Sequence, residues 1–187
     1  MERTTMKTRD NQKARVYRAE RILQDHKSSM KPMTITECQK FTNRVLARQS
    51  IIKSYGKRYI AVERGKGGGR ASGSYYSGRV ITLGVWARQP VVILHEIAHH
   101  LAGLDAEHGP HYAAVMLKLV RAVLGKEAHE KLLGSYAYHR VRVEGKGGKV
   151  AKARCPKSRK AWMEEQAKID KHWKDLHKKV LEDEKVA

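Results

Sequence analysis

The feature that most constrains this chain is the apolar segment 90–101, in which a glutamate follows the first of two histidines that stand four residues apart. Its first residue is a proline, which suits the first position of a helix, and Gly103 behind it suits a helix end. The segment therefore predicts a short buried helix. At about 100° per residue, His95 and His99 fall on one face of that helix.

Glu96 completes a His-Glu-x-x-His motif with these two histidines. Two imidazoles on one helical face can bind one Zn²⁺, and a carboxylate beside them can accept a proton from the metal-bound water. The motif therefore predicts His95 and His99 as zinc ligands and Glu96 as the catalytic base, with Zn²⁺ as the cofactor. The simpler alternative is a surface helix that carries a chance cluster of these side chains.

A third ligand is expected soon after this helix, because a catalytic zinc usually has three protein ligands and one open position. His108 lies in a turn before a second helix. Pro110 is the start signal of that helix, and residues 113–124 have the helical pattern. There its side chain can point back at the first helix. His111 and Asp105 stay open as alternative ligands.

The stretch from His95 to Tyr112 resembles the HExxH…HGP-x-[FWY] signature of the SprT/Spartan-like zinc metallopeptidases. It is more similar to the small metallohydrolases of actinobacteria and their phages, which carry HExxHH and HGP-x-[FY]. The likeness is specific over residues 86–124, and residues 10–17 resemble the start of the smaller family. The resemblance implies a zincin-like fold, His108 as the third ligand and a core position for Tyr112.

The chain departs from the SprT/Spartan-like pattern in two ways. The interval between His99 and His108 is shorter than in that family. The chain also has only two cysteines, so it lacks the four-cysteine zinc ribbon that is common there. The resemblance therefore does not extend to substrate recruitment by such a ribbon.

The composition gives one compact domain of 187 residues with a net charge of +20, from 39 Lys and Arg against 19 Asp and Glu. Such a charge attracts polyanions, which makes nucleic acid a candidate partner, although no nucleic-acid-reading motif is visible. No apolar run approaches the ~20 residues that span a membrane, and the N-terminus lacks a signal-peptide core. Two scattered cysteines favour a reducing, cytoplasmic location.

The remaining patterns predict an α+β fold: a zincin-like single domain in which a small antiparallel sheet packs on helices, with the His95 helix central. Asp10 is expected to cap the first helix, whose inward face carries Val16, Ala19 and Leu23. Thr34 and Glu37 form a capping-box pattern that opens the second helix. The other expected elements are helices at 11–27, 34–49 and 125–133, strands at 58–63 and 74–83 joined as a hairpin by the basic loop 64–73, and a strand at 136–143.

Four regions follow from these elements. They are a disordered N-terminus at 1–9, a metallohydrolase domain at 10–144, a basic glycine-rich linker at 145–157 and an amphipathic, charged C-terminal helix at 158–187.

The leading functional hypothesis is a zinc-dependent metallopeptidase that hydrolyses a protein or peptide through a Glu96-activated, zinc-bound water. By the resemblance, the edge of strand 74–83 would pair with an extended substrate. Asp105 and Glu107 are candidates to orient a ligand histidine. The candidates to stabilise the oxyanion, by chain position alone, are Tyr136, Tyr138, His139 and Arg140.

Two alternatives stay open. One is a basic nucleic-acid-binding protein with a structural or vestigial metal site, for which a fourth protein ligand would be evidence. The other is a regulatory protease that cuts one repressor or toxin partner. The sequence favours neither a particular substrate nor an oligomeric state.

Overall fold

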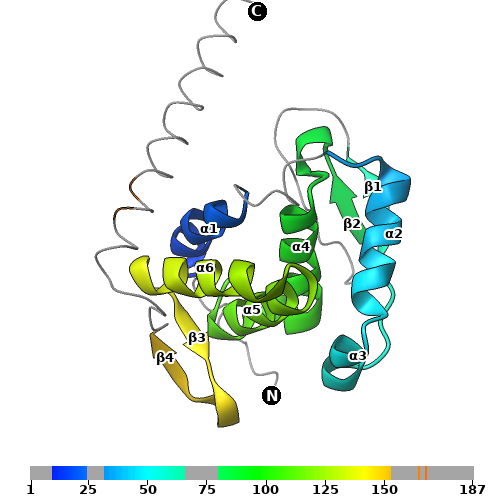
Figure 1. The fold of residues 1–187 in the computed structure, drawn as a ribbon. Helices are drawn as coiled ribbons and strands as arrows, with labels where there is room; N and C mark the ends of the chain where they lie inside the picture. The colour runs from blue at the N-terminus through cyan, green and yellow to red at the C-terminus, as the bar shows by residue number, and fades with distance from the viewer. Residues whose placement is uncertain (1–9, 25–31, 66–79, 153–163, 165–166, 168–187) are drawn as a thin grey trace, which may run out of the picture.

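The segment with the histidine pair forms helix α4 (Pro90–Ala102), which lies in the middle of the fold (Figure 1). We describe residues 10–24, 32–65, 80–152, 164 and 167 of a computed structural model. The other helices are α1 (Lys13–Glu20), α2 (Ile35–Leu46), α3 (Gln49–Tyr55), α5 (Pro110–Val123) and α6 (Gly125–Tyr138). The strands are β1 (Ala61–Arg64), β2 (Val80–Leu83), β3 (Arg142–Glu144) and β4 (Val150–Lys152).

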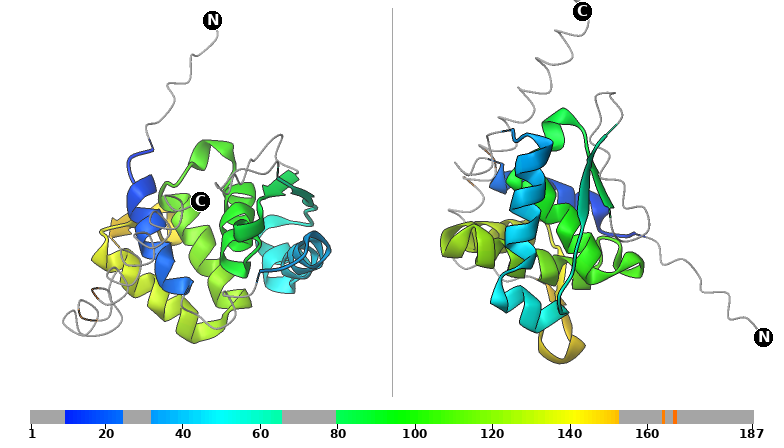
Figure 2. Two further views of the ribbon diagram at one scale, coloured as in Figure 1. Left: turned by 90° about the horizontal axis from the view of Figure 1, so that it is seen from above. Right: turned by 90° about the vertical axis from the view of Figure 1, so that its right-hand side faces the viewer.

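Helix α4 is central because it is apolar on almost every side. Val91, Ile93, Leu94 and Ile97 are all buried. Helices α1, α5 and α6 lie on one side of it, and α2 with strands β1 and β2 on the other (Figures 1 and 2). The predicted ends are confirmed, since the helix begins at proline and stops before Gly103, whose φ of 88° favours glycine.

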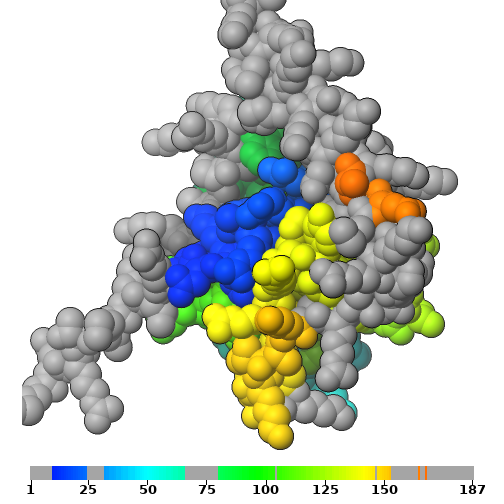
Figure 3. All heavy atoms as spheres, turned by 90° about the vertical axis from the view of Figure 1, so that its left-hand side faces the viewer, coloured from blue at the N-terminus to red at the C-terminus, as the bar shows by residue number. Residues whose placement is uncertain are grey.

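Helix α1 packs against α6, and the two lie side by side on the face shown in Figure 3. The predicted inward residues Val16, Ala19 and Leu23 are buried. The helix is shorter than the predicted 11–27: it ends at Glu20 and continues as a 3-10 turn over Arg21–Leu23. Residues 25–27 lie outside the described part of the chain.

Helix α6 extends to Tyr138, so the strand predicted at 136–143 was wrong for its first half. Leu132 and Tyr136, one helical turn apart, are both fully buried, and this i, i+4 spacing continues the helix. The chain then turns at Arg140, whose φ is 56°, and β3 occupies only residues 142–144.

Strands β1 and β2 run parallel, with Ala61 opposite Val80 and Arg64 opposite Leu83. The predicted antiparallel hairpin was therefore wrong. Parallel neighbours need a connection of about a dozen residues or more, and the glycine-rich stretch is long enough to supply one. Most of that stretch, residues 66–79, lies outside the described part of the chain.

The second sheet is the antiparallel pair β3 and β4, so the fold is α+β and mostly helical, with two small sheets. Strand β4 lies within the segment predicted as a linker, where the glycines of 145–148 form the turn between the two strands. The predicted disordered residues 1–9 lie outside the described part, as does the C-terminal helix apart from residues 164 and 167. Among the described helices, none combines the length and apolarity needed to cross a membrane.

The predicted capping box at the start of α2 is confirmed. The Glu37 backbone N–H donates to the Thr34 hydroxyl at 3.2 Å, and the Thr34 backbone N–H donates to the Glu37 carboxylate at 2.8 Å. Two N–H groups that the helix itself leaves without partners are thereby satisfied.

We expect Thr34→Ala to lower the free energy of unfolding by about 1 kcal/mol, because it removes the acceptor for the Glu37 N–H. Urea denaturation followed by circular dichroism measures the change. The matched control is Thr36→Ala, at an exposed position in the same helix. Equal losses in the two variants would show that the cap contributes nothing specific.

Candidate metal centre

Three imidazoles converge where α4 meets the turn before α5. His95 and His99 come from α4 and His108 from the turn, and one nitrogen of each ring lies within 4.8 Å of the others. The Nε2 atoms of His99 and His108 are 3.2 Å apart. Two imidazole nitrogens bound to one tetrahedral Zn²⁺ at ~2.0–2.1 Å lie about 3.3 Å apart. The spacing of these donors therefore fits a single metal ion.

The turn before α5 aims His108 at α4. Gly109 donates its N–H to the Ala106 carbonyl at 2.7 Å, and a Cβ on Gly109 would lie 2.7 Å from that same oxygen. Only glycine fits this approach without displacing the turn. Glu107 adopts a φ of 45°, and Pro110 then starts α5 at its first position.

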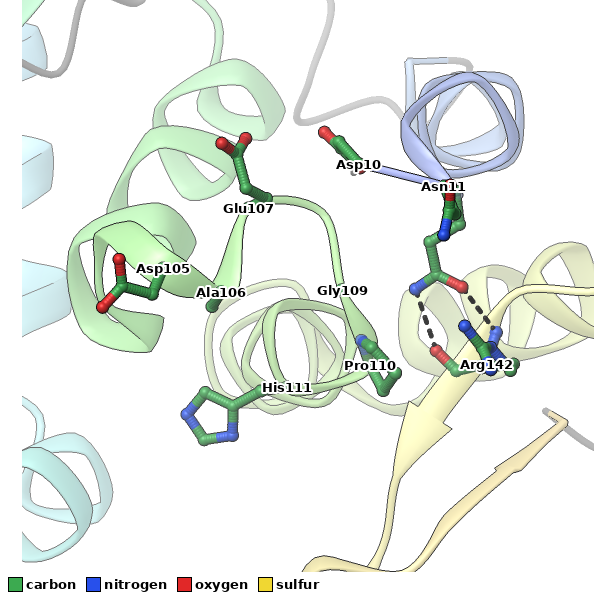
Figure 4. A pocket seen from close by; sticks show the side chains of 10 residues that line it. Asp10, Asn11, Asp105, Ala106, Glu107, Gly109, Pro110, His111 and Arg142 are labelled. Carbon is green, nitrogen blue, oxygen red and sulfur yellow. Dashed lines mark hydrogen bonds between the residues drawn. The ribbon is translucent and has the colours of Figure 1, made fainter. Parts of the chain in front are cut away.

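Gln12 holds this turn in place from the start of α1. Its amide nitrogen donates to the His108 carbonyl at 2.9 Å and to the Arg142 carbonyl at 3.2 Å. Its amide oxygen accepts the Arg142 N–H at 3.0 Å, as the dashed lines in Figure 4 show. The turn, α1 and β3 are therefore fixed to one another.

Two carboxylates orient two of the three imidazoles through hydrogen bonds at Nδ1. His95 Nδ1 donates to Glu20 at 2.7 Å, and His108 Nδ1 donates to Asp10 at 2.6 Å. A hydrogen bond at Nδ1 fixes the tautomer and leaves the lone pair of Nε2 available to a metal. Asp10 therefore does not cap α1, whose N-cap is Gln12 with no side-chain cap.

Among the described residues, neither Asp105 nor Glu107, the two carboxylates predicted to orient a ligand histidine, forms a hydrogen bond to one. Asp105 is exposed and lies outside the convergent group. Glu107 belongs to a second group with Asp10 and His108, whose ligand atoms also lie within 4.8 Å of one another. The hydrogen bond between Asp10 and His108 Nδ1 takes up two members of this second group. The three imidazoles are therefore the better set of metal ligands.

Glu20 is almost completely buried, and two tyrosines satisfy it. The hydroxyls of Tyr112 and Tyr136 donate to its Oε1 at 3.1 and 3.0 Å. Tyr112 is buried, as the resemblance implied, and its hydroxyl also lies 2.6 Å from His95 Nδ1. Tyr136, predicted as a candidate for the oxyanion, instead supports Glu20 beneath the imidazoles. Burial and the Glu20 charge raise the pKa of both tyrosines well above the usual value.

The electrostatics favour neutral imidazoles at two positions. Burial, together with the neighbouring His95 and His108, lowers the pKa of His99 to about 2. Burial also lowers the pKa of His108, although Asp10 acts in the opposite direction. For His95, burial lowers the pKa, but the charge and hydrogen bond of Glu20 outweigh it and raise the pKa overall. Neutral imidazole is the form that binds a metal.

Glu96 follows His95 on α4 and is 8 % exposed. Burial raises the pKa of its carboxyl, and the charge of Glu20 adds to the rise, while His95 opposes it. A carboxylate with a raised pKa is a stronger base, so its environment suits the transfer of a proton.

The two alternative ligands lie elsewhere. His111 has a half-exposed side chain, whose Nδ1 pairs with the Glu144 carboxylate. His111 and Asp105 line a separate pocket of about 310 Å³ beside the turn, which Glu107 and Arg142 also line (Figure 4). The structure therefore brings together His95, His99 and His108, and excludes His111 and Asp105 from that group.

Sequence reasoning missed Gln12 and Glu20, although α1 carries a signal for both. They stand four residues before and after Val16, on the face predicted to point inward. Two polar side chains on an apolar helical face need buried partners, and such a pattern indicates a site beneath the helix.

Comparisons with known proteins found no matching family model, no matching curated protein and no matching solved structure.

We expect His108→Ala to weaken zinc binding by more than about 100-fold, beyond the ~10–100-fold effect of outer-shell changes, because it removes a donor. His111→Ala is the matched control and should keep the affinity of the unmodified protein. Competition with a chromophoric chelator gives the affinity, and mass spectrometry of the metal gives its amount. Stoichiometric zinc in His108→Ala together with its loss in His111→Ala would reverse the assignment.

We expect Glu20→Gln to weaken zinc binding by roughly 10–100-fold, since the neutral amide no longer supports His95 as a charged acceptor. The same chelator competition measures the change. Glu63→Gln, at an exposed position on β1, is the control for losing one negative charge. If both variants bind zinc equally well, Glu20 has no part in holding the metal.

Proposed function

We propose that this chain is a zinc-dependent metallohydrolase that cleaves peptide bonds. The observation that carries the proposal is the convergence of three imidazole nitrogens beside a buried glutamate, with two of the rings oriented by carboxylates at Nδ1. Three histidines leave one position of a tetrahedral zinc for water or substrate, which is the arrangement of catalytic sites.

His95, His99 and His108 would hold the metal. When bound, a divalent ion such as Zn²⁺ would polarise the substrate carbonyl and lower the pKa of the attacking water toward about 7. No fourth protein ligand lies in the group among the described residues, which favours a catalytic over a structural role.

Glu96 is the proton-transfer group. It accepts a proton as a water oxygen bonds to the carbonyl carbon, and it delivers that proton to the amide nitrogen as the carbon–nitrogen bond breaks. The products are a carboxylic acid and an amine, so atoms and protons balance. Its side chain follows His95 directly on α4 and is 8 % exposed, so it is largely shielded from bulk water.

The edge of strand β2 supports a peptide as the substrate. One edge of β2 pairs with β1, and in the described part of the chain no strand pairs with its other edge. The strand leads into α4 through the short turn Val85–Ala87. An extended peptide can add to such an edge through its main chain. The resemblance of the segment from His95 to Tyr112 to metallopeptidases favours the same substrate class.

We expect Glu96→Gln to retain stoichiometric zinc and to lose activity by roughly 10²–10⁴-fold, because the amide cannot accept the proton. Cleavage is followed by mass spectrometry on a mixed peptide library with the zinc-loaded protein. Glu127→Gln, at an exposed position on α6, is the matched control and should cleave normally.

Two outcomes would contradict the proposal. Undiminished cleavage by Glu96→Gln would remove this residue as the base. Failure of the zinc-loaded, unmodified protein to cleave any member of the library would remove peptide hydrolysis as the function.

A further inference from the structure

Tyr17 lies over two of the three imidazoles. Its ring stacks on His95 with the centroids 5.2 Å apart and the planes 19° apart, and it tilts against His108 at 4.9 Å. Tyr17 is 44 % exposed, whereas His95 and His108 are 6 % and 4 % exposed. The ring therefore stands between these two imidazoles and the solvent.

The position of Tyr17 is fixed by the same segment that orients the metal donors. It precedes Glu20 by three residues on α1, so the two side chains lie on neighbouring parts of one helical surface. Glu20 holds His95 at its Nδ1 while Tyr17 covers the face of the same ring. Asp10, at the start of this segment, holds His108. A side chain placed on a rigid helix keeps its geometry relative to the donors.

The hydroxyl of Tyr17 shares its surroundings with the proposed base. Burial raises the pKa of the Tyr17 hydroxyl to about 12, and the carboxylates of Glu96, Glu20 and Asp10 add to the rise. The Tyr17 hydroxyl and the Glu96 carboxylate are therefore close enough to interact electrostatically.

The other tyrosines of the centre differ from Tyr17 in one respect. The hydroxyls of Tyr112 and Tyr136 are buried and donate to Glu20, so they are committed to holding that carboxylate. Among the described residues, the Tyr17 hydroxyl has no hydrogen-bond partner, and its side chain is accessible. Covering the imidazoles requires only the aromatic ring, and a phenylalanine would do this equally well. The hydroxyl is therefore not needed for packing and is available to a ligand.

We propose that Tyr17 is a catalytic residue, whose hydroxyl donates a hydrogen bond to the carbonyl oxygen of the substrate as that oxygen becomes negatively charged. This inference rests on the proposed hydrolase function. A donor aimed at a developing oxyanion lowers the barrier without being consumed. Tyr17 keeps its own proton, while the proton of the water passes through Glu96 to the leaving amine.

The test compares the unmodified protein with Tyr17→Phe, which keeps the ring and removes only the hydroxyl. We expect kcat on the best-cleaved library peptide to fall by about 10²–10³-fold with little change in KM. The zinc affinity should be unchanged. Tyr59→Phe is the matched control, since Tyr59 is 67 % exposed just before β1 and should show no effect.

A second readout does not depend on turnover. An N-phosphorylated dipeptide carries a tetrahedral, anionic group that imitates the charged intermediate, and its binding to the zinc-loaded protein is measured by calorimetry. We expect Tyr17→Phe to bind this compound about 100-fold more weakly than the unmodified protein, with the Tyr59→Phe control unaffected.

Each outcome has a distinct meaning. Wild-type kcat and normal binding of the phosphorylated dipeptide in Tyr17→Phe would overturn the role of Tyr17 and leave the hydrolase function standing. Loss of zinc from Tyr17→Phe would also overturn it, in favour of a purely structural ring. If the unmodified, zinc-loaded protein neither cleaves peptides nor binds the dipeptide, the proposed function fails, and the role of Tyr17 fails with it.

Discussion

Glu20 accepts hydrogen bonds from His95 on α4, Tyr112 on α5 and Tyr136 on α6, and it is itself the last residue of α1. A buried carboxylate is costly unless it is fully hydrogen-bonded, and each bond to a charged group contributes about 1.5–3 kcal/mol. One side chain therefore joins four helices. The same contact fixes the tautomer of a proposed metal ligand, so the packing of the helices and the affinity for a metal depend on a common interaction.

The local parts of the centre could be predicted from the sequence. The helix from Pro90 to Ala102, the turn with Gly109 and the start of α5 all follow from short-range rules on proline, glycine and apolar spacing. His95 and His99 share a face because of their spacing alone. His108 follows from the turn and from the resemblance, and the structure places it with the other two.

The long-range parts could not be predicted in the same way. Asp10 and Glu20 are separated from their histidine partners by 98 and 75 residues, and no local pattern pairs them. Strands β1 and β2 were expected as a hairpin because a glycine-rich segment joins them, yet they run parallel, and their direction depends on long-range packing such as that of β1 against α2. Among the described residues, positive charge is also not confined to one helix: Lys13 and Arg15 on α1 and Lys40 and Arg44 on α2 are all exposed.

The wide separation of these partners also sets the order in which the centre is completed during translation. At 5–20 residues per second, the ribosome makes His95 and His108 roughly 4–20 s after the carboxylates that will orient them. Tyr136 and Arg142, which secure Glu20 and Gln12, follow later still. The proposed metal centre can therefore be completed only after all of these segments have been synthesised and have packed against one another.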